Sequence, residues 1–122
     1  MINIIISNNS DRPIYQQIFD QVSSQIIKGE LEGDFKLPPI RTAAKELRVS
    51  IITVKKAWEE LEREGFIYAV VGKGCFVASI SDNWLIKKKI QLAKTRLEKD
   101  INYYKKLGLS LDEVLDIIKT NY

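Results

Sequence analysis

The 122-residue sequence predicts a mainly α-helical fold with one small β-hairpin. In five stretches, apolar residues recur every three or four positions, the spacing that gives a helix one apolar face. Between the third and fourth of these stretches, two short runs rich in β-branched and aromatic residues flank Gly72-Lys73-Gly74, which is typical of a hairpin tip. Hydrophobic residues make up 45% of the chain, enough for a core of modest size.

The first expected element is a short strand over residues 2–6, because the run Ile-Asn-Ile-Ile-Ile is rich in β-branched residues. A helix over about 13–28 follows, since Pro13 suits a first helical position and Gly29 suits a helix end. Its apolar face consists of Tyr15, Ile18, Phe19, Val22 and Ile26. A loop is expected over residues 31–38, because a helix cannot cross the two prolines that follow Leu37.

The next two helices are expected over about 39–47 and about 51–64. Their apolar faces consist of Ile40, Ala43, Ala44 and Leu47 in the first and Val54, Ala57, Trp58 and Leu61 in the second. Only Arg48 and Val49 separate the first helix from Ser50, a plausible N-cap of the second. A link this short makes two helices cross at a steep angle, which is the helix-turn-helix arrangement.

A hairpin and two further helices complete the chain. Strands are expected over Phe66–Val71 and Cys75–Ala78, and helices over about 83–107 and about 111–120. A hairpin directly after the second helix of a helix-turn-helix is called a wing. The expected architecture is therefore a winged helix-turn-helix in residues 1–80, followed by a two-helix dimerisation tail in residues 81–122.

The composition weighs against an enzyme, a metal site and a membrane protein. The chain has no histidine and one cysteine, so the commonest general base and the commonest metal ligands are missing or scarce. It also shows no nucleophile–base pair and no phosphate-binding loop, and we expect neither catalysis nor a cofactor. No apolar run approaches the roughly 20 residues of a membrane span. A single cysteine fits a reducing cytoplasm, which is the expected location.

The charge distribution favours a surface that meets phosphate. The net charge of +3 is too small to indicate nucleic acid by itself. Between Lys36 and Lys56, however, six basic residues face one acidic residue, Glu46. Acidic residues then gather in the stretch from Glu59 to Glu64. A basic end and an acidic end are what a domain docking one face on DNA would have.

The start of the third helix carries the candidate base contacts, because the second helix of a helix-turn-helix enters the major groove by its N-terminal residues. The guanidinium of Arg41 suits guanine or phosphate, and a lysine at the wing tip suits phosphate. Ile51 and Ile52 suit contact with thymine methyl groups. The residues expected to contact double-stranded DNA are Arg41, Ser50, Ile51, Ile52, Thr53, Lys55, Lys56, Gly72 and Lys73.

Each of these candidates has a plainer alternative that the sequence leaves open. The two isoleucines could pack against the first helix or the loop, and Arg41 could form a surface ion pair with an acid such as Glu46. Lys73 could be a solvated hairpin residue. If Ile51 and Ile52 instead form a docking patch, the chain is a winged-helix protein–protein interaction module.

In the fourth helix, apolar residues recur at spacings of three and four, which predicts a continuous seam. The seam consists of Ile86, Ile90, Ala93, Leu97, Ile101 and Tyr104. The fifth helix is less than half as long and cannot cover it. We therefore expect a second copy of the chain on this seam, as a homodimer.

Several stretches resemble the N-terminal domain of GntR-family bacterial transcription regulators, with their elements in the family's order and spacing. They are Pro13-Ile-Tyr-Gln-Gln-Ile, Leu37-Pro-Pro-Ile-Arg41, Val49-Ser-Ile-Ile-Thr-Val-Lys-Lys-Ala57, Leu61-Glu-Arg-Glu-Gly-Phe-Ile67 and Gly72-Lys-Gly-Cys-Phe-Val77. The resemblance covers about residues 10–78. It implies that Arg41, residues 50–53, Lys55, Gly72 and Lys73 touch operator DNA. Many members carry Arg where Ile51 stands. The operator sequence that other members bind therefore cannot be assumed for this chain.

The short tail resembles that of the YtrA-like subfamily, whose tails serve chiefly to dimerise. This resemblance implies a transcription regulator that binds a near-palindromic operator as a homodimer. The expected kind of regulator is a repressor. Two helices cannot enclose a typical small-molecule pocket. The sequence leaves open whether a small-molecule effector binds. If one does, we expect it between the tail and the winged helix or across the dimer.

Overall fold

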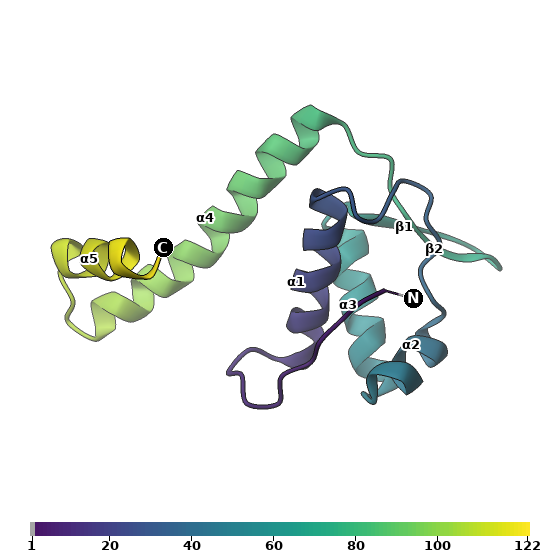
Figure 1. Ribbon diagram of the computed structural model, residues 1–122, viewed down its shortest axis with the longest axis horizontal. Coiled ribbons are helices and arrows are strands. Elements are labelled where there is room, and N and C mark those ends of the chain that lie inside the picture. The colour runs from purple at the N-terminus through teal and green to yellow at the C-terminus, as the bar shows by residue number, and fades with distance from the viewer. Residues whose placement is uncertain (1) are drawn as a thin grey trace. The chain divides into compact units, whose positions relative to one another are not determined.

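A computed structural model describes residues 2–122, which fall into two compact units that divide between Ile80 and Ser81. The first unit contains α1 (Ile14–Ile27), α2 (Ile40–Leu47), α3 (Ile51–Arg63), β1 (Ile67–Val70) and β2 (Gly74–Val77) (Figure 1). The second contains α4 (Asp82–Lys106) and α5 (Leu111–Asn121). The predicted mainly helical winged fold is confirmed, and each predicted helix ends within one residue of the observed one.

The core of the first unit is built around one face of α3. Val54, Ala57 and Leu61 have no exposed surface, and Trp58 is almost wholly buried. They pack against the apolar face of α1, where Ile18 and Val22 are also fully buried. Phe66, which follows α3, is buried as well and meets the ring of Phe19 edge to face at 5.9 Å. Burial of this face determines which side of α3 is left for solvent.

The turn between α2 and α3 depends on a left-handed residue. Arg48 has φ 58°, and its N–H donates to the Lys45 carbonyl at 3.3 Å while the Val49 N–H donates to the Ala44 carbonyl at 3.0 Å. This pair of hydrogen bonds is the Schellman closure of a helix, which reverses the chain within two residues. It lets Ser50 begin α3 at once, as the predicted helix-turn-helix requires.

The wing has a third, strand-like member that the sequence did not predict. β1 and β2 pair antiparallel, with Tyr68 opposite Phe76. Lys36 forms a bridge with Phe76 on the other edge of β2. The Leu37 N–H donates to the Cys75 carbonyl, and the Val77 N–H donates to the Phe35 carbonyl, both at 2.9 Å. Part of the predicted 31–38 loop therefore extends the sheet.

A side-chain hydrogen bond ties this third member to β1. The Tyr68 hydroxyl donates to Asp34 Oδ1 at 2.7 Å, and the Tyr68 ring stacks on Phe76 at 5.6 Å. Because the bond stabilises the protonated phenol beside a carboxylate, the pKa of Tyr68 lies above its ordinary value. Asp34 itself has φ 67°, a conformation that Asp tolerates better than most residues.

The strand predicted over residues 2–6 is wrong, because no other strand pairs with this extended segment within the described chain. Glutamine side chains of α1 take the place of a partner strand. Gln21 accepts from the Ile5 N–H at 2.8 Å and donates to the Ile5 carbonyl at 2.6 Å. Gln17 bonds both main-chain groups of Ser7 in the same way, and Gln25 donates to the Asn3 carbonyl.

The second unit is a helical hairpin with well-formed helix starts. The Ser81 side chain caps α4 by accepting from the Trp84 N–H, and the predicted capping box at the start of α5 pairs Ser110 with Glu113. The hydrogen bonds from Ser110 to the Glu113 carboxyl lower the pKa of that carboxyl. None of the helices within residues 2–122 has the length and apolar character that crossing a membrane requires.

We expect Gln21→Ala to release the N-terminal segment without unfolding the unit. It removes two main-chain hydrogen bonds at Ile5, each worth about 1 kcal/mol net. The Ile5 amide should then exchange with solvent at least several-fold faster, as measured by NMR hydrogen exchange. Gln91→Ala, at an exposed position in α4, is the matched control and should leave that rate unchanged. Equal Ile5 exchange in both variants would contradict the pairing.

Candidate DNA-binding surface

The first turn of α3 begins at a side-chain cap. The Ser50 hydroxyl accepts from the Thr53 N–H at 3.1 Å and lies 2.7 Å from the Thr53 hydroxyl. Ser50 is exposed, whereas Thr53 is half-buried. Both residues were predicted as DNA contacts, and the structure gives both hydroxyls a part in holding the helix start. A hydroxyl retains further hydrogen-bonding capacity, so this role does not exclude a contact with DNA.

The two isoleucines that follow are exposed rather than buried. Ile52 has 78% of its surface exposed and Ile51 has 42%. The alternative of core packing against α1 or the preceding loop therefore fails for Ile52. A large apolar side chain that is this exposed at a helix start contributes little to the stability of the unit.

The two lysines of α3 lie in different surroundings. Both are exposed, but the Lys56 ammonium lies 4.0 Å from the centre of the Tyr15 ring, a cation–π contact that links α3 to α1. Lys55 makes no such contact among the described residues. The role of Tyr15 in holding Lys56 was missed, since the spacing indicated only that Tyr15 belongs to the inner face of its helix.

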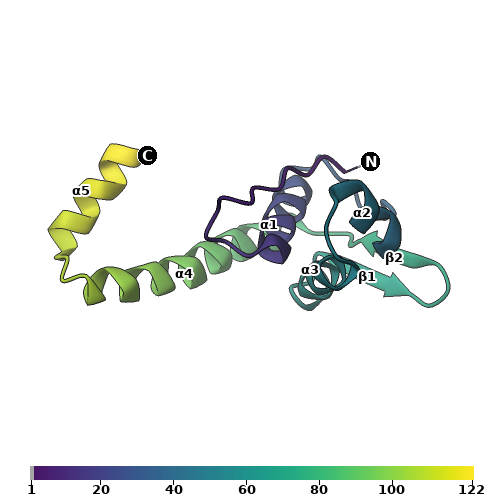
Figure 2. The same cartoon turned by 90° about the horizontal axis from the view of Figure 1, so that it is seen from below.

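Arg41 lies in the first turn of α2 and is exposed. Within the described residues it has no ion pair, so the alternative of a pair with Glu46 is not observed. In both views α2 and the hairpin lie to the right of α1, and the tip of the hairpin points away from it (Figures 1 and 2). The element that carries Arg41 and the wing are thus on a common side of α1.

The wing tip is a glycine-dependent turn that presents Lys73. Gly72 has φ 78° and Gly74 has φ 116°, conformations that residues with a side chain rarely adopt. The Lys73 N–H donates to the Val70 carbonyl at 2.9 Å, and the Lys73 side chain is exposed. The wing therefore holds its lysine on a defined turn.

Charge along α3 changes sign between its two ends. Lys55 and Lys56 lie in the first half, whereas glutamates occupy positions 59, 60 and 62 toward its end and position 64 directly after it. Glu60 is paired with Arg63. A polyanion is attracted to the first half of the helix and repelled from the second, which orients the unit with the start of α3 toward the phosphates.

Cys75, in β2, is partly buried, and burial raises the pKa of its thiol. The thiol is therefore protonated at neutral pH and a weak nucleophile. This is the behaviour of a packing residue rather than of a redox switch.

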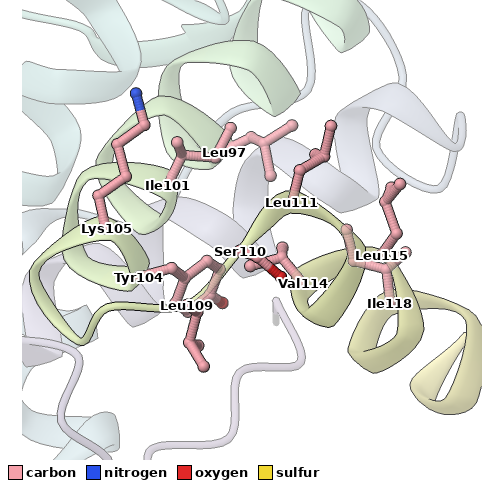
Figure 3. Close-up of a pocket in the computed structure, with 10 residues that line it drawn as sticks. All are labelled: Leu97, Ile101, Tyr104, Lys105, Leu109, Ser110, Leu111, Val114, Leu115 and Ile118. Carbon is pink, nitrogen blue, oxygen red and sulfur yellow. The ribbon is translucent and has the colours of Figure 1, made fainter.

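The predicted seam of α4 divides into two parts. Leu97, Ile101 and Tyr104 line an apolar groove of about 240 Å³ with residues of α5 (Figure 3). The α5 side of the groove and the turn before it contribute Leu109, Leu111, Val114, Leu115 and Ile118. Ile86, Ile90 and Ala93 lie outside the groove and are exposed.

Comparison with known proteins identifies the family. A family model described as bacterial regulatory proteins, gntR family, matches residues 14–77. The HTH-type transcriptional repressor YtrA of Bacillus subtilis (strain 168) is 33% identical over 116 residues, which cover 95% of this chain and 89% of YtrA.

Solved structures agree with this match. A transcriptional antiterminator from Listeria monocytogenes EGD-e is 34% identical with a TM-score of 0.72, over 98% of this chain and 89% of that one. The DNA-binding domain of AraR, solved in complex with operator ORX1, is 30% identical with a TM-score of 0.56, over 63% of this chain and 96% of that one.

The family model spans more than half of the chain, and the similarity to YtrA extends through the helical tail. The named relatives are regulators rather than enzymes, in agreement with the sequence prediction. The chain belongs to the GntR family of bacterial regulatory proteins and is a DNA-binding transcription regulator.

Proposed function

We propose that this regulator is a repressor that binds a near-palindromic operator as a homodimer in the cytoplasm. The observation that carries the proposal is the exposed start of α3, where Ile52 and Lys55 point away from the buried face and Ile51, beside that face, is still 42% exposed. Arg41 and the Lys73 wing lie on elements that share one side of α1. The repressor assignment is supported by the name of YtrA, which the chain resembles over almost its whole length.

Each predicted contact has a distinct part in this proposal. Ile51 and Ile52 contact thymine methyl groups in the major groove, and Arg41 reads guanine or holds a phosphate. Lys55, Lys56 and Lys73 neutralise phosphates, which fixes the register of the protein on the duplex. Ser50, Thr53 and Gly72 hold these side chains and approach the backbone of the DNA closely.

The proposed dimer rests on apolar surface that the second unit cannot bury by itself. Ile86 and Ile90 are each 57% exposed, and no residue of α4 is buried. On α5, only Val114 is buried, while Leu115 and Ile118, which line the groove, remain exposed. A second copy covers such a surface with matching residues, because a twofold interface pairs one patch with itself. Two winged helices then bind two half-sites.

The alternative function is docking of a protein partner on Ile51 and Ile52, and it is favoured only by their exposure. Apolar docking strengthens or holds as salt increases, whereas DNA binding weakens steeply. Binding sites selected from a random DNA pool would give the operator, its symmetry and its half-site spacing together. Failure to select any sequence at low salt would exclude the proposed operator binding.

We expect Arg41→Ala to weaken binding of the selected operator by roughly 1–3 kcal/mol and to relax base preference at one position. Lys55→Ala should weaken binding to all duplexes alike and flatten the salt dependence by about one unit of log–log slope. Fluorescence anisotropy titrations over a salt series measure both. Lys28→Ala, an exposed lysine after α1, is the control. Titrations of Arg41→Ala and Lys55→Ala that match this control would remove both roles.

Ser50→Ala should destabilise the first unit by about 1 kcal/mol, because it removes the N-cap of α3. Ser50→Asp keeps a capping oxygen and a favourable charge at the helix start, so thermal stability should return. The same aspartate should nevertheless weaken DNA binding, since a carboxylate faces phosphate. Normal operator affinity for Ser50→Asp would place this position away from the duplex.

Ile90→Glu should convert the dimer to a monomer with unchanged helix content, because it puts a charge on the exposed seam without touching the groove. Gln91→Glu adds the same charge one position away and should remain dimeric. Sedimentation equilibrium and circular dichroism measure the two properties. A wild-type chain that sediments as a monomer at micromolar concentration would rule out the tail as a dimer interface.

A further inference from the structure

We infer that Lys36 is a phosphate contact of this regulator, presented by the wing beside Lys73. Lys36 belongs to the basic stretch of the sequence, but it was predicted to lie in a loop and is not among the predicted DNA contacts. The structure instead makes it part of the sheet, as the partner of Phe76 on the free edge of β2. The inference rests on the DNA binding proposed above and adds a residue to that surface.

The sheet register determines the face on which Lys36 lies. Tyr68 pairs with Phe76, and Phe76 pairs with Lys36, so these three residues form one cross-strand row. Side chains of directly paired residues lie on the same face of a sheet. The neighbouring row holds Ile67 and Val77, which are buried against the core. The Lys36 row is therefore on the outer face.

The direction of the Lys36 side chain follows from its contact with Gly74. The Lys36 Cε lies 3.3 Å from the point that a Cβ at Gly74 would occupy, so the aliphatic stem crosses the position where a side chain is missing. Gly74 lies two residues from Phe76 and directly after Lys73. The stem thus lies along the sheet toward the tip of the wing, and its ammonium is near the Lys73 turn.

The charges around Lys36 favour an anionic partner. Within residues 2–122 Lys36 has no ion pair, and the carboxylate of Asp34, two positions earlier, already accepts from the Tyr68 hydroxyl. Lys36 and Lys73 therefore give the wing two exposed positive charges that no described acidic side chain neutralises. A phosphate bound by Lys36 releases counterions from the DNA, which is the main source of sequence-independent affinity.

Lys36→Met tests the inference, because methionine keeps most of the apolar stem and removes only the charge. The full-length chain is titrated with its selected operator and with an unrelated duplex, at several salt concentrations. We expect weaker binding to both duplexes by a similar factor, and a log–log salt slope smaller by about 0.9. Lys36→Arg should restore the slope, and thermal melting should be unchanged in both variants.

Lys28→Met is the matched control for the loss of one unit of net charge. An effect of Lys36→Met no larger than that of Lys28→Met would overturn the inference. If the wild-type chain binds neither duplex at low salt, the proposed operator binding itself fails. Salt-dependent wild-type binding that Lys36→Met leaves unchanged refutes the role of Lys36 alone.

Discussion

The arrangement of this regulator depends on the burial of one face of α3. Val54, Ala57, Trp58 and Leu61 meet α1 and Phe66 with almost no exposed surface. Because this face of α3 is buried, the helix cannot turn about its own axis. A turn by one residue would expose Val54 and bury a lysine. The same contact that stabilises the unit therefore fixes which side chains face outward. One face of α3 thus stabilises the unit, and the other is available for binding.

Most of the fold could be predicted because its determinants are local. The apolar spacing in α1 and α3, the two-residue link at Arg48 and the Ser50 cap each depend on a few neighbouring residues. The glycines at residues 72 and 74 likewise predict the turn at the wing tip. The GntR resemblance adds the order in which these parts assemble, which spacing alone does not provide.

The features that escaped prediction all depend on residues far apart in the sequence. Residues 2–6 have the composition of a strand, but a strand needs a partner, and only the fold shows that the amides of Gln17, Gln21 and Gln25 occupy that place. Lys36 and Phe76 are forty positions apart, so their bridge leaves no local pattern. The Tyr15–Lys56 contact was missed for the same reason.

The glutamine pairing of the N-terminal segment has a geometric limit. Four residues of helix advance about 6 Å, and two residues of extended chain advance about 6.6 Å, so glutamines at every fourth position can meet alternate peptide groups. The two repeats fall out of step by about 0.6 Å at each rung. Over three glutamines the accumulated offset is small. In a much longer series the offset would lengthen the hydrogen bonds until they could no longer form. A helix can thus imitate a neighbouring strand, but only for about two of its turns.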